Sequence, residues 1–329
     1  MTDIQSIIDD VLALEPEPLA RHVMARMIEA PAQNRHPDLL DGPGLLQQPQ
    51  VARVLVSQWT DGSWGRFHSM DTTRKQFPKT TESAIRLLLA LGLTVDDAPL
   101  SRARTYLEQI LRHEVAMRDP AEPNERWPIG AELFAASCLA LIDPANPLLD
   151  APIQRWVGVV SLTFTDGTYQ AAREVEAQRV VHGLSGELYY LHLSNRYTAE
   201  LLGARPDSLD PSTREAYGRW LCETDRGIGY LGVPIAQFAA RTTIDAASRR
   251  ELPRWFESVP IVTRLRAIRR CSSGIQAWLF HQQGEGGLWD FGPVQLPRIS
   301  SSWRKPINRR IDHTLHVLCV LHGLESLQP

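Results

Sequence analysis

Apolar residues recur along this chain at the spacing of one helix face. The stretch from Thr80 to Leu93 carries Ala84, Leu87, Leu88 and Leu91. Residues three or four positions apart lie on the same side of an α-helix, so this stretch is predicted to be a helix with one buried face. Alternating apolar and polar residues, which would indicate strands, are confined to short and isolated runs. The pattern therefore predicts an all-α protein.

The same spacing returns along most of the chain and predicts on the order of ten to twelve helices. Besides residues 80–93, the helical stretches are 102–115, 131–142, 153–162, 173–193, 212–222, 254–268, 272–282 and 312–324. Asp210 followed by Pro211 is typical of an N-cap and the first residue of a helix. No connecting stretch has the composition of a linker between two cores. Residues 1–329 are therefore predicted to form one domain, with residues 1–45 as an N-terminal helical segment packed on the rest.

Turns that contain glycine repeat between the predicted helices. The segments Gln58 to Trp64 and Gln283 to Trp289 both read Q-x-x-x-G-x-W. Asp166 to Tyr169 repeats the end of this pattern with Tyr in place of Trp, and Gly227 to Tyr230 is a more distant copy. Glycine lets a chain leave a helix in a left-handed conformation, and a Gln amide can bridge free backbone groups at helix ends. The turns are predicted to fasten successive helices together.

These turns resemble the QW motif of the squalene and oxidosqualene cyclases and of the related prenyltransferases. The stretch Trp278 to Trp289 has the aromatic, aliphatic, Gln, Gly and Trp positions of that motif. The stretch Gln58 to Trp64 has its core, with Arg53 where an aromatic residue is usual. The resemblance implies a single α/α toroid, in which about five or six helix pairs form an inner and an outer ring around a central cavity.

The same resemblance implies an enzyme that cyclises an isoprenoid-like substrate. Triterpene cyclases protonate their substrate with an Asp-x-Asp-Asp cluster, and class I terpene synthases use Asp-Asp-x-x-Asp, but this sequence contains neither. Aromatic residues make up 7% of the chain, which is modest for a cavity that stabilises carbocations. We therefore predict a terpene-cyclase-like enzyme, an isomerase or lyase, which uses acid catalysis on a small or medium apolar substrate and no cofactor.

Two other functions stay open on the sequence. The missing acid cluster suits a non-catalytic toroid that binds a hydrophobic ligand or a protein partner. The second alternative is a zinc-dependent, prenyltransferase-like transferase, because His313-Thr314 and Cys271 resemble positions at which protein prenyltransferases hold zinc. Arg269 and Arg270 stand where the carboxylate ligand of that family is expected, so no metal site is assigned.

Polar residues that follow the first QW turn are the main candidates for catalysis. In a toroid, the loop between such a turn and the next inner helix opens at one end of the cavity. Asp71 is predicted to be the general acid or to orient His68, and Asp312 and Glu82 are the alternatives. Each carboxylate also has a structural explanation, since Asp71 can cap a turn, Asp312 can cap a helix and Glu82 suits a first helical turn.

The residues predicted to contact the substrate come from the turns and from breaks between helices. Arginine there can bind an anionic group, and tyrosine or glutamate can take part in proton transfer. Aromatic residues and histidines at such positions also occur as core residues, and that interpretation stays open. The set is Trp64, Arg66, Phe67, Glu187, Tyr190, Tyr230, Trp289 and His313.

Composition limits the partners and the compartment. The chain has 35 Lys and Arg against 38 Asp and Glu, a formal net charge of −3, and so no excess of positive charge for nucleic acid. Its cysteines are single, without a C-x-x-C pair, as expected in a reducing compartment. The N-terminus does not resemble a secretory signal, and no apolar run approaches the roughly 20 residues that cross a bilayer. We predict a cytoplasmic protein without a membrane span.

Overall fold

The computed structural model describes residues 4–28, 40–70, 73, 75–267, 269–284 and 286–325. Within these ranges the regular structure consists of fifteen α-helices and three short 3₁₀ helices, with one isolated β-bridge between Asn195 and Gly229. The prediction of an all-α protein is confirmed for this part of the chain. None of the helices in the same ranges has the length and apolar character needed to cross a membrane.

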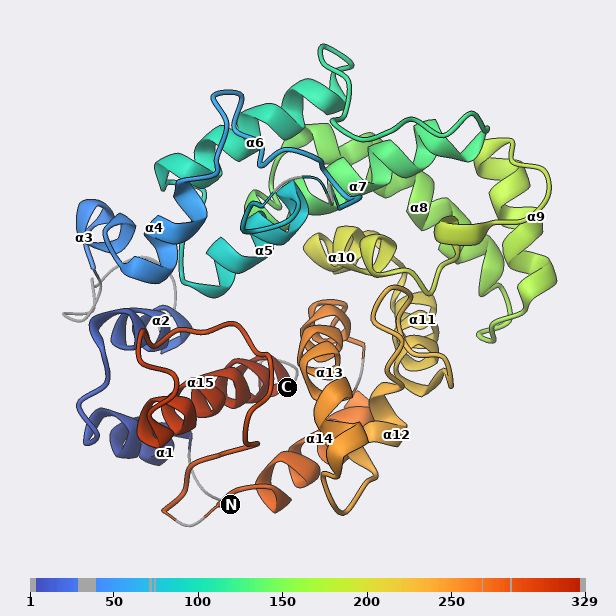
Figure 1. Cartoon of the computed structure of the whole chain (residues 1–329). Coiled ribbons are helices and arrows are strands. Elements are labelled where there is room, and N and C mark those ends of the chain that lie inside the picture. The colour runs from blue at the N-terminus through green and yellow to red at the C-terminus, as the bar shows by residue number, and fades with distance from the viewer. Residues whose placement is uncertain are drawn as a thin grey trace.

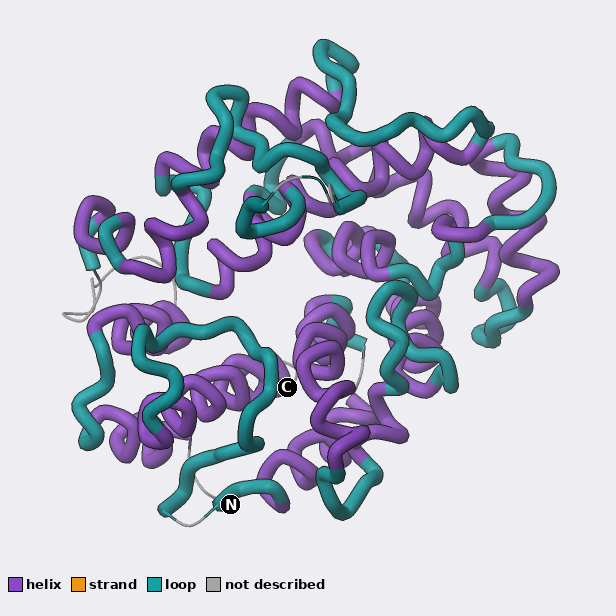
Figure 2. Tube along the Cα trace, in the orientation of Figure 1, coloured by secondary structure: helices purple, strands orange, loops and turns teal. Residues whose placement is uncertain are grey.

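The helices follow one another around the molecule, joined by loops of varied length (Figures 1 and 2). Their bounds are α1 Ile4–Leu12, α2 Pro18–Ile28, α3 Gly42–Leu46, α4 Pro49–Leu55, α5 Thr81–Ala90, α6 Ala98–Leu111, α7 Arg126–Ile142, η1 Pro147–Leu149, α8 Asp150–Thr163, α9 Ala171–His182, η2 Tyr189–Leu191, α10 Arg196–Ala204, η3 Pro206–Ser208, α11 Pro211–Glu223, α12 Ile235–Ala239, α13 Ala246–Arg264, α14 Arg269–His281 and α15 Pro306–Glu325.

Capping residues place several helix ends where the sequence predicts them. Thr80 caps α5 and Asp210 caps α11, each through a side-chain oxygen that accepts backbone N–H groups. The predicted helix over residues 173–193 is too long, because α9 ends at His182 and Gly183 follows with φ 72°. Asn195 then caps the separate helix α10, which the sequence analysis did not predict.

Six helices, α2, α5, α7, α10, α13 and α15, lie beside one another and run in the same direction. Across each boundary, residue numbers rise together on both helices. The pairs around α10 are Glu82 with Tyr197, Arg86 with Glu200, Phe134 with Tyr197, Ser137 with Glu200, Arg196 with Glu257, and Gly203 with Arg264. The pairs on α15 are Phe256 with His316, Gly323 with Thr263, Asn308 with Glu17, and Cys319 with Met27. In Figure 1, α5, α10, α13 and α15 lie towards the middle, and α1, α4, α6, α8, α11 and α14 lie further out.

The two QW segments form the same hydrogen-bonded corner. In each, the Gln amide donates to the Gly carbonyl four residues later, the Trp indole donates to a carbonyl of the preceding helix, and the Trp backbone N–H donates to a threonine hydroxyl of the following inner helix. These bonds run from Gln58 to Gly62 (3.1 Å), Trp64 to Val54 (2.9 Å) and Trp64 to Thr81 (2.9 Å), and from Gln283 to Gly287 (2.6 Å), Trp289 to Leu279 (2.7 Å) and Trp289 to Thr314 (3.1 Å). Each corner therefore fastens two helices, as predicted.

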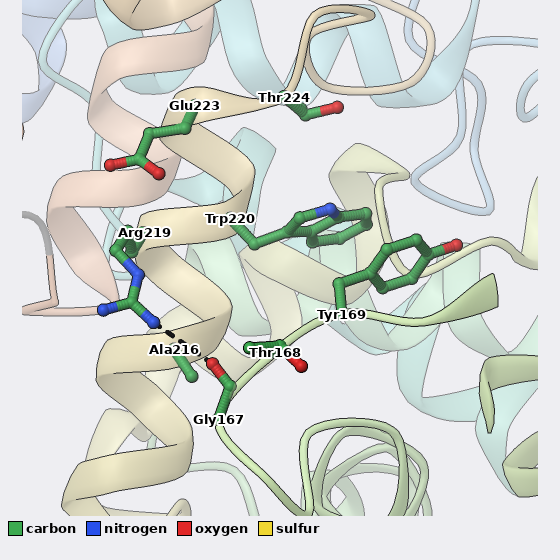
Figure 3. A pocket seen from close by; sticks show the side chains of 8 residues that line it. All are labelled: Gly167, Thr168, Tyr169, Ala216, Arg219, Trp220, Glu223 and Thr224. Carbon is green, nitrogen blue, oxygen red and sulfur yellow. Dashed lines mark hydrogen bonds between the residues drawn. The ribbon is translucent and has the colours of Figure 1, made fainter.

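The third copy, Asp166 to Tyr169, keeps the turn and changes the side chains that hold it. Its first carboxylate accepts a backbone N–H two residues later, as Asp61 does in the first copy. Arg219 of α11 takes the place of the Gln and donates to the carbonyl of Gly167 at 3.1 Å (Figure 3). Tyr169 stacks on Trp220, with ring centroids 4.1 Å apart. This corner is therefore held from α11.

Candidate active site

His68 lies beside the first turns of α5 and α10, among aromatic side chains. Its ring stacks on Phe134 of α7, with centroids 4.9 Å apart and planes 20° apart. Tyr197 of α10 and Tyr230 approach the same ring by their edges, at 5.8 and 5.3 Å. About a quarter of the His68 side chain remains exposed, at 26%. The imidazole is therefore held by packing and still open to a ligand on one side.

The loop that carries His68 is fixed through its backbone. The carboxylate of Asp119 accepts the backbone N–H groups of His68 and Ser69, at 2.5 and 3.1 Å, and also the Ser69 hydroxyl. Just before them, the N–H of Phe67 donates to the carbonyl of Arg118 at 2.8 Å, and the Phe67 ring is fully buried. These bonds place the His68 side chain without using its ring nitrogens.

The Nδ1 atom of His68 meets two oxygen atoms. It lies 3.2 Å from Oε1 of Glu82 and 2.8 Å from the Tyr197 hydroxyl. That hydroxyl also lies 2.8 Å from Oε2 of Glu82. The Tyr197 hydroxyl donates its proton to Glu82. A proton on Nδ1 of His68 then faces the hydroxyl oxygen of Tyr197 and Oε1 of Glu82, so all three side chains have a hydrogen-bond partner. No group in the described ranges bonds to Nε2 of His68.

The surroundings of His68 and Glu82 favour the charged form of both groups. Burial alone would lower the pKa of His68, but the hydrogen bond and the charge of Glu82 outweigh it, and the pKa of His68 is raised above its ordinary value of 6.5. Burial alone would raise the pKa of Glu82, but contacts with His68 and Arg86 outweigh it, and the pKa of Glu82 is lowered. The two side chains therefore form an ion pair, and His68 keeps its proton to a higher pH than an unperturbed imidazole does.

A buried network of charges stands behind Glu82. Arg86 donates to Glu82 at 3.5 Å and to Glu200 of α10 at 2.5 Å. Glu200 is 3% exposed and also accepts the Ser137 hydroxyl at 2.8 Å and the guanidinium of Arg196 at 3.2 Å. Burial opposes the ionisation of Glu200, but the two arginines outweigh it and lower its pKa to about 2. The network holds Arg86 in place, and Arg86 keeps Glu82 ionised.

This arrangement suits general acid–base chemistry. A histidine whose Nδ1 is bound by a carboxylate presents Nε2 in one orientation, as a donor when charged and as an acceptor when neutral. A pKa near the working pH makes both directions of proton transfer efficient. The site can therefore give a proton to an oxygen or nitrogen atom of a ligand, or remove one, while Glu82 stabilises the imidazolium.

Two of the four residues predicted for catalysis, His68 and Glu82, are brought together. Asp71 lies outside the described residues. Asp312 is fully buried, and its carboxylate accepts the backbone N–H groups of Ile299 and Ser300, both at 3.0 Å. Burial raises the pKa of Asp312 to about 6. Because α15 begins at Pro306, Asp312 does not cap this helix as the structural explanation expected, and it fixes the preceding loop instead.

Four of the residues predicted to contact substrate expose no surface to a ligand. Their relative exposure is 0%, because they hold corners and loops together. They are Trp64, Phe67, Trp289 and His313. The Nδ1 atom of His313 accepts the backbone N–H of Phe291 at 3.1 Å, and burial lowers the pKa of His313 to about 4. This histidine is therefore neutral in the fold.

The other four residues predicted to contact substrate have accessible side chains. Tyr230 packs against His68, and Tyr190 packs against Phe134 with centroids 5.8 Å apart, so both lie in the aromatic surround of the site. Arg66 is partly buried, and Glu187 is exposed. Contact of these residues with a substrate stays a prediction.

Cys271 and His313, the residues of the zinc-dependent alternative, contact groups other than a set of metal ligands. In the part of the chain that the structure describes, no group of three or more His, Cys, Asp and Glu side chains is placed to hold a metal ion. Cys271 lies against Cys222 of α11. The Nε2 atom of His313 is buried and has no hydrogen-bond partner among the described residues.

Sequence analysis missed three residues of the site: Tyr197, Arg86 and Glu200. Two of them belong to α10, which begins just beyond the predicted helix over residues 173–193 and was not predicted. Two signals mark α10 in the sequence. Asn195 stands three residues before a threonine, as an N-cap does, and Arg196 and Glu200 have the i, i+4 spacing of a helical ion pair. Arg86 stands four residues after Glu82 in the predicted helix over residues 80–93, where the same spacing applies.

A surface pocket beside the third corner does not bring reactive groups together. It has a volume of about 240 Å³, and Tyr169, Arg219, Trp220 and Glu223 are among its lining residues (Figure 3). The two aromatic rings stack on each other, and Arg219 is bonded to the carbonyl of Gly167. Figure 3 shows the Glu223 carboxylate pointing away from the rings. We therefore place the candidate active site at His68.

Comparison of the chain with models of protein families, with curated proteins and with solved structures finds no match in any of the three. The resemblance to QW-motif proteins accordingly stays a prediction, carried by the two corners at Gln58 and Gln283. The function is inferred below from the chemistry of the chain's own residues.

Proposed function

We propose that the chain is an α/α toroid and a terpene-cyclase-like enzyme, an isomerase or lyase, in which His68 transfers a proton to or from an apolar substrate. The observation that carries the proposal is the geometry of the imidazole. Glu82 and Tyr197 bind Nδ1, and Nε2 has no partner in the described ranges. The parallel order of the inner helices and the two matching QW corners support the toroid.

Two accessible side chains on inner helices support a hollow between them. Arg264 of α13 and Cys319 of α15 are exposed, yet burial among protein atoms lowers the pKa of Arg264 and raises the pKa of Cys319 to about 12. A side chain that is both accessible and poorly solvated lies in a recess. Arg264 packs beside Gly203 of α10, and Cys319 contacts Met27 of α2, so both recesses face the inner helices.

The acid strength of His68 limits the class of substrate that it can protonate. An imidazolium whose pKa is raised above 6.5 can protonate oxygen and nitrogen atoms, but it is too weak an acid for an unactivated alkene. The substrate is therefore an apolar molecule that carries one reactive oxygen, such as an epoxide or a carbonyl. Glu82 stabilises the charged imidazole, Tyr197 orients it, and Phe134 shields one face of the ring from water.

The first step of the test is native mass spectrometry of the purified protein, which identifies an apolar molecule retained in the hollow. That molecule is then incubated with wild type, with His68→Gln and with His281→Gln, which changes an exposed histidine on α14. We expect wild type and His281→Gln to convert it at the same rate and His68→Gln to be slower by about 10²- to 10⁴-fold, with binding retained.

Two results would count against the enzyme. If His68→Gln converts the molecule as fast as wild type does, His68 is not the proton-transfer group. If wild type returns the molecule unaltered after long incubation, the chain is the non-catalytic ligand-binding toroid of the first alternative.

A further inference from the structure

Two cysteines from different helices lie against each other where α11 packs on α14. Cys222 is in the last turn of α11 and is fully buried. Cys271 is in the first turn of α14 and is partly exposed. A Cβ atom on Gly218, one turn before Cys222, would lie 2.6 Å from the Cβ atom of Ala267, four residues before Cys271, so the two segments touch here. The interaction of the two thiols lowers the pKa of Cys271 and raises that of Cys222. The pair is separate from the candidate active site at His68.

The two thiols differ in the way that a reacting pair requires. Cys271 is accessible, and its place in the first turn of a helix favours the thiolate, although the carboxylates of Glu215 and Glu223 oppose it. Cys222 has no exposed surface, so a reagent in solution reaches it only through Cys271. Cys271 therefore suits the attacking role and Cys222 the resolving role.

The other two cysteines of the chain have no thiol beside them. Cys138 is buried next to Arg86, and burial raises its pKa to about 12. Cys319 is exposed and contacts the Met27 sulfur, which cannot form a disulfide. These two residues therefore serve as internal controls in any oxidation experiment.

We propose that Cys222 and Cys271 form a reversible intramolecular disulfide, with a small disulfide such as oxidised glutathione as the oxidant. The Cys271 thiolate attacks one sulfur of oxidised glutathione, forms a mixed disulfide and releases one glutathione thiolate, which takes up the proton that Cys271 lost. Cys222, after losing its proton to water, attacks the Cys271 sulfur and releases the second glutathione. Two protein thiols lose two electrons in all, and one glutathione disulfide becomes two glutathione thiols.

The new bond would tie together the two ends of one segment. Residues 222–271 include α12 and the inner helix α13, which packs between α10 and α15. A bond from α11 to α14 closes this segment into a loop and restricts the unfolded chain. The disulfide is therefore expected to stabilise the wall that α13 forms.

The test uses the full chain and oxidised glutathione, followed by alkylation of free thiols, tryptic digestion and mass spectrometry. The expected product is a link between peptides 220–226 and 271–298, two hydrogens lighter than the separate thiol peptides and lost on reduction. In Cys222→Ser the expected product is a single glutathione on Cys271, and in Cys271→Ser we expect Cys222 to stay reduced. Cys222→Ala replaces Cys222→Ser if the buried hydroxyl prevents folding.

Two outcomes overturn the proposal. One is a wild-type protein that carries glutathione on Cys271 with Cys222 still free, because the two sulfurs then cannot reach bonding distance. The other is a protein that is modified at Cys319 alone, because Cys271 is then unreactive. In the oxidised wild type, a melting temperature above that of the reduced protein, with no such shift in Cys271→Ser, is expected.

Discussion

Glu82 and His68 set each other's charge, and this coupling can be measured on a single residue. In Glu82→Gln the imidazole stays buried but loses the carboxylate that outweighs burial. We therefore expect the pKa of His68 to fall below 6.5, in a titration of its ring proton resonances by NMR. Glu257→Gln is the control, because Glu257 bonds to Arg196 of the same network and not to His68. An unchanged pKa in Glu82→Gln would contradict the ion pair.

His182 gives the fold a sensitivity to acid. Its ring packs against that of Trp156 at a tilt of 50°, with centroids 5.0 Å apart. The Nε2 atom is buried without a hydrogen-bond partner in the described ranges, and burial lowers the pKa of His182 to about 4. Between pH 6.5 and 4 the unfolded chain binds a proton here that the folded chain does not, so this residue lowers stability as the pH falls. The contribution is absent above pH 6.5.

His182→Phe removes that proton site and the unpaired nitrogen. We expect the variant to be more stable than wild type in urea unfolding, with an advantage that is larger at pH 5 than at pH 7. His281→Phe, the same substitution at an exposed position, is the control. Equal differences at the two pH values would mean that His182 is solvated in the fold.

Asp312 is expected to act on stability through the loop that it binds. In Asp312→Asn an amide NH₂ replaces one carboxylate oxygen, so a donor then faces a buried backbone N–H of Ile299 or Ser300 from which that oxygen accepted a hydrogen bond. The expected loss of unfolding free energy is about 2 kcal/mol. Asp210→Asn makes the same chemical change at an exposed N-cap, where Asn is as good as Asp, and should be nearly neutral.

Only part of the candidate site could be predicted from the local sequence. His68 and Glu82 stand close to a recognisable turn, so their position suggested a role. Tyr197, the other partner of His68, is 129 residues away in the chain. No local pattern connects residues so far apart, because their meeting depends on how α5, α7 and α10 pack.

At the level of elements, the corners were the most predictable part of the chain. Within each QW corner, the hydrogen bond of the Gln amide joins residues four apart, and that of the Trp indole joins residues ten apart. A short motif therefore specifies the turn. The ends of α9 were less predictable, because Gly183 ends that helix while the apolar pattern continues beyond it. The apolar periodicity of α9 continues through η2, so the predicted helix was extended past Gly183 to residue 193.

Two glycines in equivalent corners provide a comparison between elements. Gly62 has φ 90°, and a Cβ atom there would lie 2.3 Å from the carbonyl oxygen of Arg102. Gly167 has φ 76°, with nothing within 4 Å of the same position. In Gly167→Ala we expect a loss of about 1 kcal/mol from the left-handed backbone. In Gly62→Ala the clash adds to that cost, and the loss is expected to be about 3 kcal/mol or more.

Thermal or urea unfolding of both variants measures this difference. A near-equal loss in the two variants would mean that α6, which carries Arg102, can move away from the corner. In that case the first QW corner does not fasten α6, and the bond of Gln58 to the carbonyl of Pro99 does not hold it either.

At the scale of the whole molecule, the first helices of the chain cover the last one. α1 and α2 pack on α15, and the Glu17 carboxylate between them accepts the backbone N–H of Ser301 at 2.7 Å and the Asn308 amide at 2.9 Å. The sequence predicted that residues 1–45 pack on the rest but did not identify α15 as their partner. No local sequence pattern identifies a contact between the two ends of a chain.

Removal of residues 1–28 is expected to prevent cooperative folding. The apolar side chains lost include Ile7, Val11, Leu19 and Val23, all buried, and each contributes about 1.5–3 kcal/mol. Their sum is comparable with the total stability of an ordinary domain, about 5–15 kcal/mol. Circular dichroism during heating measures the transition, and removal of residues 1–3 alone is the control. A sharp transition in the shorter chain would show that the remaining helices suffice.

The shared position of two helix starts gives the surroundings of His68 an electrical bias. Each α-helix carries the equivalent of about half a positive charge at its first turn. The first turns of α5 and α10 both lie beside His68, since Glu82 and Tyr197 belong to them. An electron-rich oxygen atom of a ligand is therefore attracted to this end of the two helices, which is where the imidazole lies.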